Sequence, residues 1–247
     1  MDMMELGRGE TVMLLHGGGL APWSCRALAE RLAARYHVLV PVLDGHAGSG
    51  CAFTSIEENA ARLLRCIDEH SSGRLLTLCG LSLGGQIAAE MLAQRPDLCS
   101  FALLESVSVL PSPLLAALIP PSIALSGGLI RKEWFSRLQF RYLRLPGALY
   151  PDYYRDSCAI RQTDMAAFLR ASTLYEGKSS LADVQAQVLI VAGGREEGRI
   201  IRSASRLREM LPGGRMRLVP GMHHGELSIK YPEKYMELLS GLMEDRL

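Results

Sequence analysis

The sequence has almost no excess charge, no long apolar run free of proline, and no paired cysteine motif. Its 247 residues include 27 Lys and Arg against 26 Asp and Glu, a formal net charge of +1. A chain so close to neutrality has no general attraction for nucleic acid or anionic membranes, so we expect a small-molecule substrate and no nucleic-acid partner. The six cysteines are scattered without a CxxC pair, which is more typical of reduced thiols than of a disulfide framework.

Targeting and nucleotide-binding signals are also missing. The opening decapeptide MDMMELGRGE is too polar and acidic for a secretory signal, which favours a cytoplasmic protein. Residues 106–130 carry no charge, but Pro111, Pro113, Pro120 and Pro121 interrupt any helix long enough to cross a membrane, so we expect no membrane span. The chain has no GxGxxG and no complete P-loop GxxxxGK[ST], since the one GKS tripeptide, residues 177–179, has Ser172 where the first glycine would stand; this argues against a nucleotide site.

Short apolar runs alternate with longer amphipathic stretches along most of the chain. This alternation predicts an α/β fold with a mostly parallel sheet of about six strands and helices on both faces. The predicted strands are Thr11 to Leu15, His37 to Leu43, Leu75 to Cys79, Phe101 to Leu104, Gln187 to Ala192 and Met216 to Val219. The predicted helices are Trp23 to Arg35, Ser55 to His70, Gly84 to Arg95, Ile200 to Leu211 and Pro232 to Arg246.

One stretch breaks this rhythm, because no strand is evident from Ser106 to about Leu181. The segment is several times longer than an ordinary crossover, so we interpret residues 106–181 as a helical lid inserted between core segments 1–105 and 182–247. Its uncharged first part favours a substrate with an apolar acyl or alkyl group.

The second part of this segment, RKEWFSRLQFRYLRL, predicts an amphipathic basic helix. Arg137, Arg141 and Arg144 recur at helical i, i+4 and i+7 spacing, opposite Phe135 and Leu138. Two interpretations stay open: a solvated charged face, or a surface for an anionic substrate such as an acyl-CoA.

The strongest catalytic signal is CGLSLGG, residues 79–85, which follows the apolar run LLTLC and precedes a predicted helix. A G-x-S-x-G turn in this context exposes the serine at a sharp corner, where Gly80 and Gly84 remove Cβ clashes. We therefore predict Ser82 as the nucleophile. The Leu83 amide, at the start of the helix, is expected to donate to a developing oxyanion. A tight turn with an incidental serine is the alternative.

A glycine cluster, HGGG at residues 16–19, follows the predicted strand TVMLL. Glycine lets the backbone approach a substrate carbonyl closely, so we expect an amide here to complete the oxyanion hole. Gly18 is the predicted donor and Gly19 its substitute. The alternative is a flexible glycine turn.

A histidine pair follows the last predicted strand, in VPGMHHGE at residues 219–226. His224 is predicted as the general base because Gly225 lets the loop turn it toward Ser82, whereas His223 is expected to point away. Adjacent histidines rarely chelate one ion and no third ligand has suitable spacing, so we expect no metal.

The acid that would orient the histidine is open to three assignments. The loop GGREEG holds two glutamates and no aspartate, and Glu196 stands where a carboxylate is expected. Glu197 is its rival, and Glu105 at the end of the strand FALL is a third candidate. The alternative is that both loop glutamates are surface charges.

These elements occur in the order serine, acid, histidine, and the chain resembles the α/β-hydrolase superfamily. The resemblance runs nearly end to end, through LLHGGG, DGHAGSG, GLSLGG, VLIVAGGREE and VPGMHHG. It implies a Ser-His-acid hydrolase that needs no cofactor. In DGHAGSG, residues 44–50, His46 either lines the pocket or forms a turn. Two features depart from the family: the glutamate acid, and a short N-terminus that we expect to lack the opening antiparallel hairpin.

The sequence therefore predicts a serine hydrolase that cleaves a carboxylic ester or thioester. Amide, lactone and carbon–carbon bonds stay open, because one fold can host all of these reactions. The competing class is a non-catalytic or slow-turnover signal receptor with the same fold, and a lyase or acyltransferase on the same site is a third interpretation. The oligomeric state is not determined by the sequence.

Overall fold

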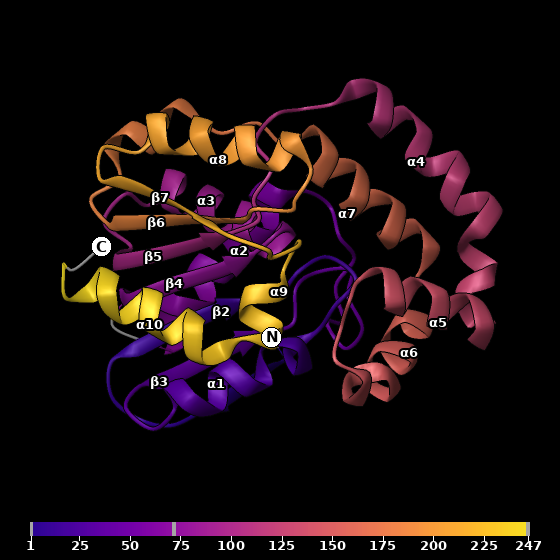
Figure 1. Cartoon of the computed structure of the whole chain (residues 1–247), viewed down its shortest axis with the longest axis horizontal. Helices are drawn as coiled ribbons and strands as arrows, with labels where there is room; N and C mark the ends of the chain where they lie inside the picture. The colour runs from indigo at the N-terminus through magenta and orange to yellow at the C-terminus, as the bar shows by residue number, and fades with distance from the viewer. Residues whose placement is uncertain (1, 71–72, 246–247) are drawn as a thin grey trace.

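A seven-stranded sheet forms the centre of the computed structural model, which describes residues 2–70 and 73–245 (Figure 1). The strands are β1 (Met3–Leu6), β2 (Thr11–Leu15), β3 (His37–Pro41), β4 (Leu75–Leu81), β5 (Cys99–Glu105), β6 (Gln187–Gly193) and β7 (Gly214–Val219). Their order is β1-β3-β2-β4-β5-β6-β7, and every neighbouring pair is parallel except β1 with β3. The predicted α/β class and mostly parallel sheet are confirmed.

The first strand corrects the prediction of about six strands and of a missing N-terminal antiparallel element. Met3–Leu6 pairs antiparallel with β3, from Met3 opposite Pro41 to Leu6 opposite Val38. The segment lies at the edge of the sheet and is only partly buried. It therefore lacks the continuous apolar run that marks the central strands, and the sequence did not reveal it.

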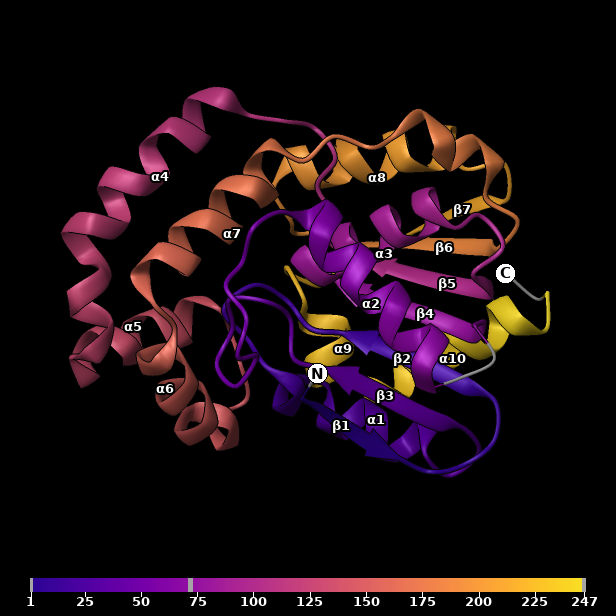
Figure 2. The same cartoon turned by 180° about the vertical axis from the view of Figure 1, so that it is seen from behind.

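Helices cover both faces of the sheet (Figures 1 and 2). The core helices are η1 (Pro22–Cys25), α1 (Arg26–Leu32), α2 (Ile56–His70), α3 (Leu83–Gln94), α8 (Gly198–Met210), α9 (Glu226–Lys230) and α10 (Pro232–Met243). Side chains alternate along each strand, so Val12 and Leu14 pack with α1, α9 and α10, whereas Met13 and Leu15 pack with α2, α3 and α8. Arg246, the predicted end of the last helix, lies outside the described residues.

Between β5 and β6 the chain forms a group of helices beyond one end of the sheet (Figures 1 and 2). They are α4 (Pro113–Ser126), η2 (Gly127–Arg131), α5 (Glu133–Tyr142), η3 (Gly147–Leu149), α6 (Tyr150–Ala159), α7 (Gln162–Leu174) and η4 (Ser179–Asp183). We call residues 106–181 the helical insertion. Helix α7 joins the main core through the buried Phe168, and α4 lies against α7 on the outer side. The movement expected of a lid stays a prediction.

The prolines of the insertion do not interrupt its first helix, contrary to expectation, because Pro120 and Pro121 lie inside α4. With η2, the segment Pro113–Arg131 reaches 19 residues with a mean hydropathy of 1.7, so by length and composition alone it is suited to cross a membrane. Each proline removes a backbone hydrogen bond, and on this largely exposed helix solvent can replace the lost partner. Only 17% of its most apolar window is buried.

Candidate active site

Ser82 occupies the sharp turn between β4 and α3, at the carboxyl end of a central strand. Its backbone adopts φ 54° and ψ −115°, a conformation that a non-glycine residue keeps only where the surrounding structure imposes it. A Cβ on Gly84 would lie 2.4 Å from the carbonyl oxygen of Leu15 and 2.5 Å from that of His16. The glycine therefore lets α3 start directly against the end of β2.

A pocket of about 600 Å³ opens at Ser82 between the carboxyl ends of the strands and the helical insertion. The three residues predicted as catalytic, Ser82, Glu196 and His224, all line it. His223, which was expected to point away, lines the pocket as well, while its amide donates to Glu226 Oε2 at 2.8 Å. The hydrogen bonds of the described residues include none between Ser82 Oγ and His224, a contact that in serine hydrolases often tightens only with substrate.

Glu196 and His224 are joined directly, from the loops that follow β6 and β7. Nδ1 of His224 lies 2.9 Å from Oε2 of Glu196. The carboxylate is almost completely buried, with 1% of its side chain exposed, whereas 47% of the imidazole is exposed. The Gly193 amide donates to Oε1 of the same carboxylate at 2.6 Å. With Nδ1 facing a carboxylate, the ring carries its proton there and presents Nε2 to the pocket.

Ser106 is a member of this arrangement that the sequence analysis did not identify. Its hydroxyl donates to Oε1 of Glu196 at 2.9 Å and accepts a 3.3 Å hydrogen bond from the Gly225 amide. Ser106 therefore ties the acid to the loop that carries His224. The signal was available in principle, since Ser106 follows β5, and the carboxyl ends of neighbouring parallel strands meet at one edge of the sheet.

Glu105, the third candidate for the acid, binds the start of α9 and makes no hydrogen bond to His224 among the described residues. Its Oε1 accepts a hydrogen bond from the Leu227 amide at 3.2 Å, and both carboxyl oxygens accept from the Ser228 amide. These are the free amides at the start of α9, the helix that follows His224. Burial raises the pKa of the Glu105 carboxyl to about 7. Glu197, the other rival, lines the pocket and precedes α8.

The predicted oxyanion donors differ in whether their amides already donate a hydrogen bond. Gly18 lies beside Leu83, since a Cβ on Gly18 would lie 3.5 Å from Leu83 Cδ2. Within the described chain, neither of these two amides donates a hydrogen bond. Gly19 is different, because its amide donates to Nε2 of His46 at 2.9 Å and is already occupied. The Gly19 amide is therefore no substitute donor in this structure. None of the three residues is among those that line the pocket.

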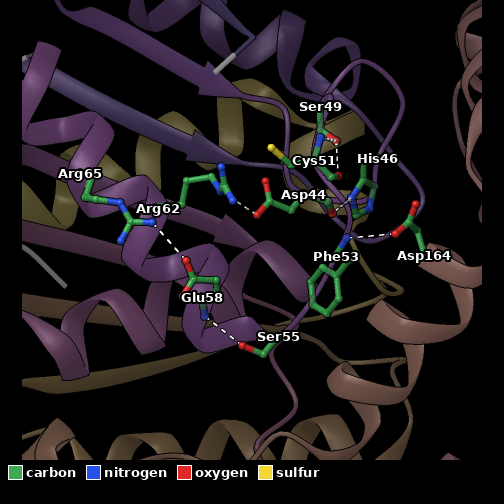
Figure 3. A network of polar contacts seen from close by, with 10 residues as sticks. All are labelled: Asp44, His46, Ser49, Cys51, Phe53, Ser55, Glu58, Arg62, Arg65 and Asp164. Carbon is green, nitrogen blue, oxygen red and sulfur yellow. Dashed lines mark hydrogen bonds and ion pairs between the residues drawn. The ribbon is translucent and has the colours of Figure 1, made fainter.

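The loop of residues 44–50, whose polar contacts Figure 3 shows, contacts the glycine cluster through His46. His46 is buried and is not among the residues that line the Ser82 pocket. Its Nδ1 donates to the Asp44 carbonyl at 3.0 Å, its Nε2 holds the Gly19 amide, and its ring stacks on Phe168 of α7. Burial lowers the pKa of His46 to about 4, so the ring is neutral and can accept from Gly19.

A second contact joins this loop region to the helical insertion. The Phe53 amide donates to Oδ1 of Asp164 on α7 at 3.0 Å, as Figure 3 shows. The neighbouring His16 is fully buried and accepts from the Leu43 amide at 3.2 Å, and burial lowers the pKa of its imidazole to about 3. Both histidines therefore act as neutral structural groups. Among the described residues, no group of three or more His, Cys, Asp or Glu is arranged to hold a metal ion.

Comparisons with known proteins agree with this fold. The chain is 25% identical over 237 residues to the polyketide synthase ThaQ of Burkholderia thailandensis, covering 90% of this chain but only 11% of that much longer protein. It is 23% identical to a pimeloyl-[acyl-carrier protein] methyl ester esterase of Nitrosomonas europaea, covering 96% of each. A solved structure of a thermophilic esterase from Thermogutta terrifontis superposes with a TM-score of 0.80 at 17% identity, over 99% of this chain and 93% of that chain, which shows the shared fold alone.

A sequence model of one family covers nearly the whole chain. The model of the alpha/beta hydrolase family matches residues 12–238, a range that contains all of β2 except Thr11, β3 to β7, the helical insertion and every residue of the pocket. The serine turn after β4 and the histidine loop after β7 lie within the same match, whereas β1 precedes it. The chain belongs to the alpha/beta hydrolase family.

Proposed function

We propose that this protein is a serine hydrolase that cleaves a carboxylic ester or thioester, with Ser82 as nucleophile, His224 as general base and Glu196 as the orienting acid. The observation that carries the proposal is the 2.9 Å contact between His224 Nδ1 and the buried Glu196 carboxylate, in the pocket that Ser82 also lines. A buried carboxylate fixes the tautomer of the imidazole and stabilises the imidazolium formed during the reaction. The esterase name of the Nitrosomonas europaea relative supports the same reaction class.

The proposed reaction proceeds in two steps. The Ser82 oxygen attacks the substrate carbonyl carbon, its proton passes to Nε2 of His224, and the carbonyl electron pair moves to the oxygen. The tetrahedral intermediate collapses to an acyl-serine, and the leaving alcohol or thiol takes the proton from His224. Water then loses a proton to His224 and attacks the acyl carbon, which releases the acid and restores Ser82.

The amides of Leu83 and Gly18 are the proposed oxyanion donors. Leu83 is the first residue of α3, so its amide has no acceptor within the helix and lies at the positive end of the helix dipole. Gly18 lies beside it, and the occupied Gly19 amide holds the glycine loop in place. Donors that are fixed before the reaction stabilise the developing negative charge without reorganising.

An apolar acyl or alkyl group, expected from the uncharged start of the insertion, receives limited support from the pocket. No residue of α4 lines the pocket. The apolar part of the Ser82 pocket lining consists of Ile200, Leu143 and the ring of Tyr142. The rest of the pocket lining is polar or charged. We therefore keep the ester or thioester assignment and expect a short apolar segment at most.

Labelling by a fluorophosphonate, followed by turnover of p-nitrophenyl esters, tests the proposal. We expect stoichiometric labelling of Ser82 in the intact protein, none in Ser82→Ala, and ester hydrolysis that disappears in the same variant. Ser108→Ala is the matched control, because Ser108 lines the pocket without a place in the proposed mechanism. Labelling without multiple turnover would favour the receptor interpretation, and hydrolysis that survives in Ser82→Ala would contradict the assignment of the nucleophile.

A further inference from the structure

We propose that the substrate carries an anionic group, a carboxylate or a phosphate, and that arginines of the Ser82 pocket hold it, with Arg199 as the principal anchor. The inference rests on the proposed function, because it takes the Ser82 pocket as the substrate site, and it adds the chemical class of the substrate.

The Ser82 pocket has an excess of arginines without protein partners. Arg141, Arg144, Arg195 and Arg199 all line it. Among the ion pairs formed by the described residues, none involves any of these four side chains. The only carboxylates in the lining are those of Glu196, which is engaged by the catalytic cluster, and Glu197. Four guanidinium groups against two carboxylates therefore leave the lining of the pocket with an excess of positive charge.

Three arginines elsewhere in the helical insertion are paired with carboxylates. Arg137 binds Glu133, Arg155 binds both Asp152 and Asp156, and Arg161 binds Asp164. Each of these guanidinium groups finds a carboxylate on its own helix or next to it. Arg131 and Arg170 of the insertion also form no ion pair among the described residues, so the distinguishing feature of the Ser82 pocket is that four such arginines line one cavity.

Arg199 provides the sharpest observation. Its Nη1 is buried and meets no acceptor among the described residues. A buried donor of a charged group without an acceptor is destabilising, and so is a cation in the first turn of a helix, where the positive end of the dipole lies. Arg199 is the second residue of α8 and is subject to both effects. An anionic substrate group bound to this guanidinium would remove both.

A neighbouring hollow extends the basic surface. It has a volume of about 500 Å³ and is lined by Arg141 and Arg144, which it shares with the Ser82 pocket, and by Arg137 and Lys230, which pair with Glu133 and Glu226. A substrate whose anionic group belongs to a long leaving group can run from Ser82 into this hollow. A substrate whose anionic group ends a short acyl chain would stay within the Ser82 pocket. The shared chemistry is the anion, and substrate pairs distinguish the two sources.

Two matched substrate pairs test the inference. On the acyl side, mono-p-nitrophenyl adipate is compared with p-nitrophenyl hexanoate, and on the leaving-group side, hexanoyl-CoA is compared with hexanoyl-N-acetylcysteamine. We expect the anionic member of one pair to be favoured in kcat/KM by about tenfold to hundredfold, the size of a charge-assisted hydrogen bond. In Arg199→Gln this preference should fall by a similar factor. Arg206→Gln is the control, because Arg206 is exposed on the same helix and pairs with Glu209.

Direct binding supplies a readout that does not depend on turnover. In calorimetric titrations, adipate or inorganic phosphate should bind to the parent protein and to Arg206→Gln. In Arg199→Gln the affinity for the same anion should fall by about tenfold or more. Hydrolysis that depends on Ser82 without an anion preference in either pair, together with no Arg199-dependent binding, would overturn the inference alone. Hydrolysis that persists in Ser82→Ala would overturn the proposed function, and the titration would still decide whether Arg199 binds anions.

Discussion

The Ser106 hydroxyl donates a 2.9 Å hydrogen bond to Oε1 of Glu196, a residue 90 positions away in the sequence that follows the neighbouring strand. The other carboxylate oxygen faces His224. Ser106 itself adopts φ 58°, a conformation that costs a non-glycine residue roughly 1–2 kcal/mol. A strained residue at the centre of the cluster indicates that the surrounding sheet ends fix the position of the acid.

Removing the Ser106 hydroxyl should slow catalysis by misplacing Glu196. We expect Ser106→Ala to lower kcat about tenfold with little change in KM, since one hydrogen bond to a charged group is lost. Ser106→Gly is the companion variant, because glycine adopts φ 58° without strain but also lacks the hydroxyl. Steady-state kinetics on a p-nitrophenyl ester measure both. An equal fall in the two variants assigns the effect to the hydroxyl, whereas full activity in Ser106→Gly would contradict its positioning role.

The identity of the acid can be settled by three isosteric changes. Glu196→Gln should lower kcat by about a thousandfold or more, because the amide cannot stabilise the imidazolium and favours the wrong tautomer. Glu197→Gln should stay within about threefold of the parent, since Glu197 makes no contact with His224 among the described residues. Fluorophosphonate labelling rates check the same order without turnover. A larger loss in Glu197→Gln than in Glu196→Gln would reverse the assignment.

Gly84, two residues after Ser82, should be irreplaceable. In Gly84→Ala the new methyl group would overlap the backbone carbonyls of Leu15 and His16, which cannot move without displacing β2. We expect at least about 3 kcal/mol of destabilisation, as for severe overpacking in a core. Urea denaturation followed by circular dichroism measures it. Gly128→Ala in η2 is the control, because a Cβ there meets open space, and it should leave the unfolding midpoint nearly unchanged.

The buried Glu105 should give folding stability a characteristic dependence on pH. Its pKa is about 7 in the folded protein against an ordinary value of 4.5, so the folded state holds a proton that the unfolded state releases between these values. The contribution of Glu105 to folding stability therefore falls as pH rises from 4.5 to 7, by up to about 3 kcal/mol. In Glu105→Gln this contribution should disappear, while the amide oxygen still accepts from the Leu227 and Ser228 amides.

The comparison with the parent protein isolates Glu105 from the buried histidines. His16 and His46 have pKa values lowered to about 3 and about 4, so they add stability as pH rises toward 6.5. Their contribution has the opposite sign and is the same in parent and variant. The difference between the two unfolding curves at pH 4.5 and pH 7.5 therefore reports the carboxyl group. A difference that does not change with pH would contradict the raised pKa.

Much of the fold followed from the sequence because local patterns encode it. Apolar runs such as Val188 to Ala192 are buried on both faces, and the sequence therefore located six strands within a few residues. The serine turn is equally local, since a strand, two glycines and a helix within a dozen residues specify it. The histidine loop and its order relative to Ser82 were readable for the same reason.

The tertiary structure decided what depends on contacts between distant segments. Met3–Leu6 is a strand because it pairs with β3, and no local pattern in the sequence predicts this pairing. The occupied state of the Gly19 amide depends on His46, 27 positions away. The separate roles of Glu105 and Glu196 arise because adjacent strand ends bring one carboxylate to α9 and the other to His224. Sequence alone determined which chemical groups are present and on which elements, whereas packing between those elements determined which groups meet.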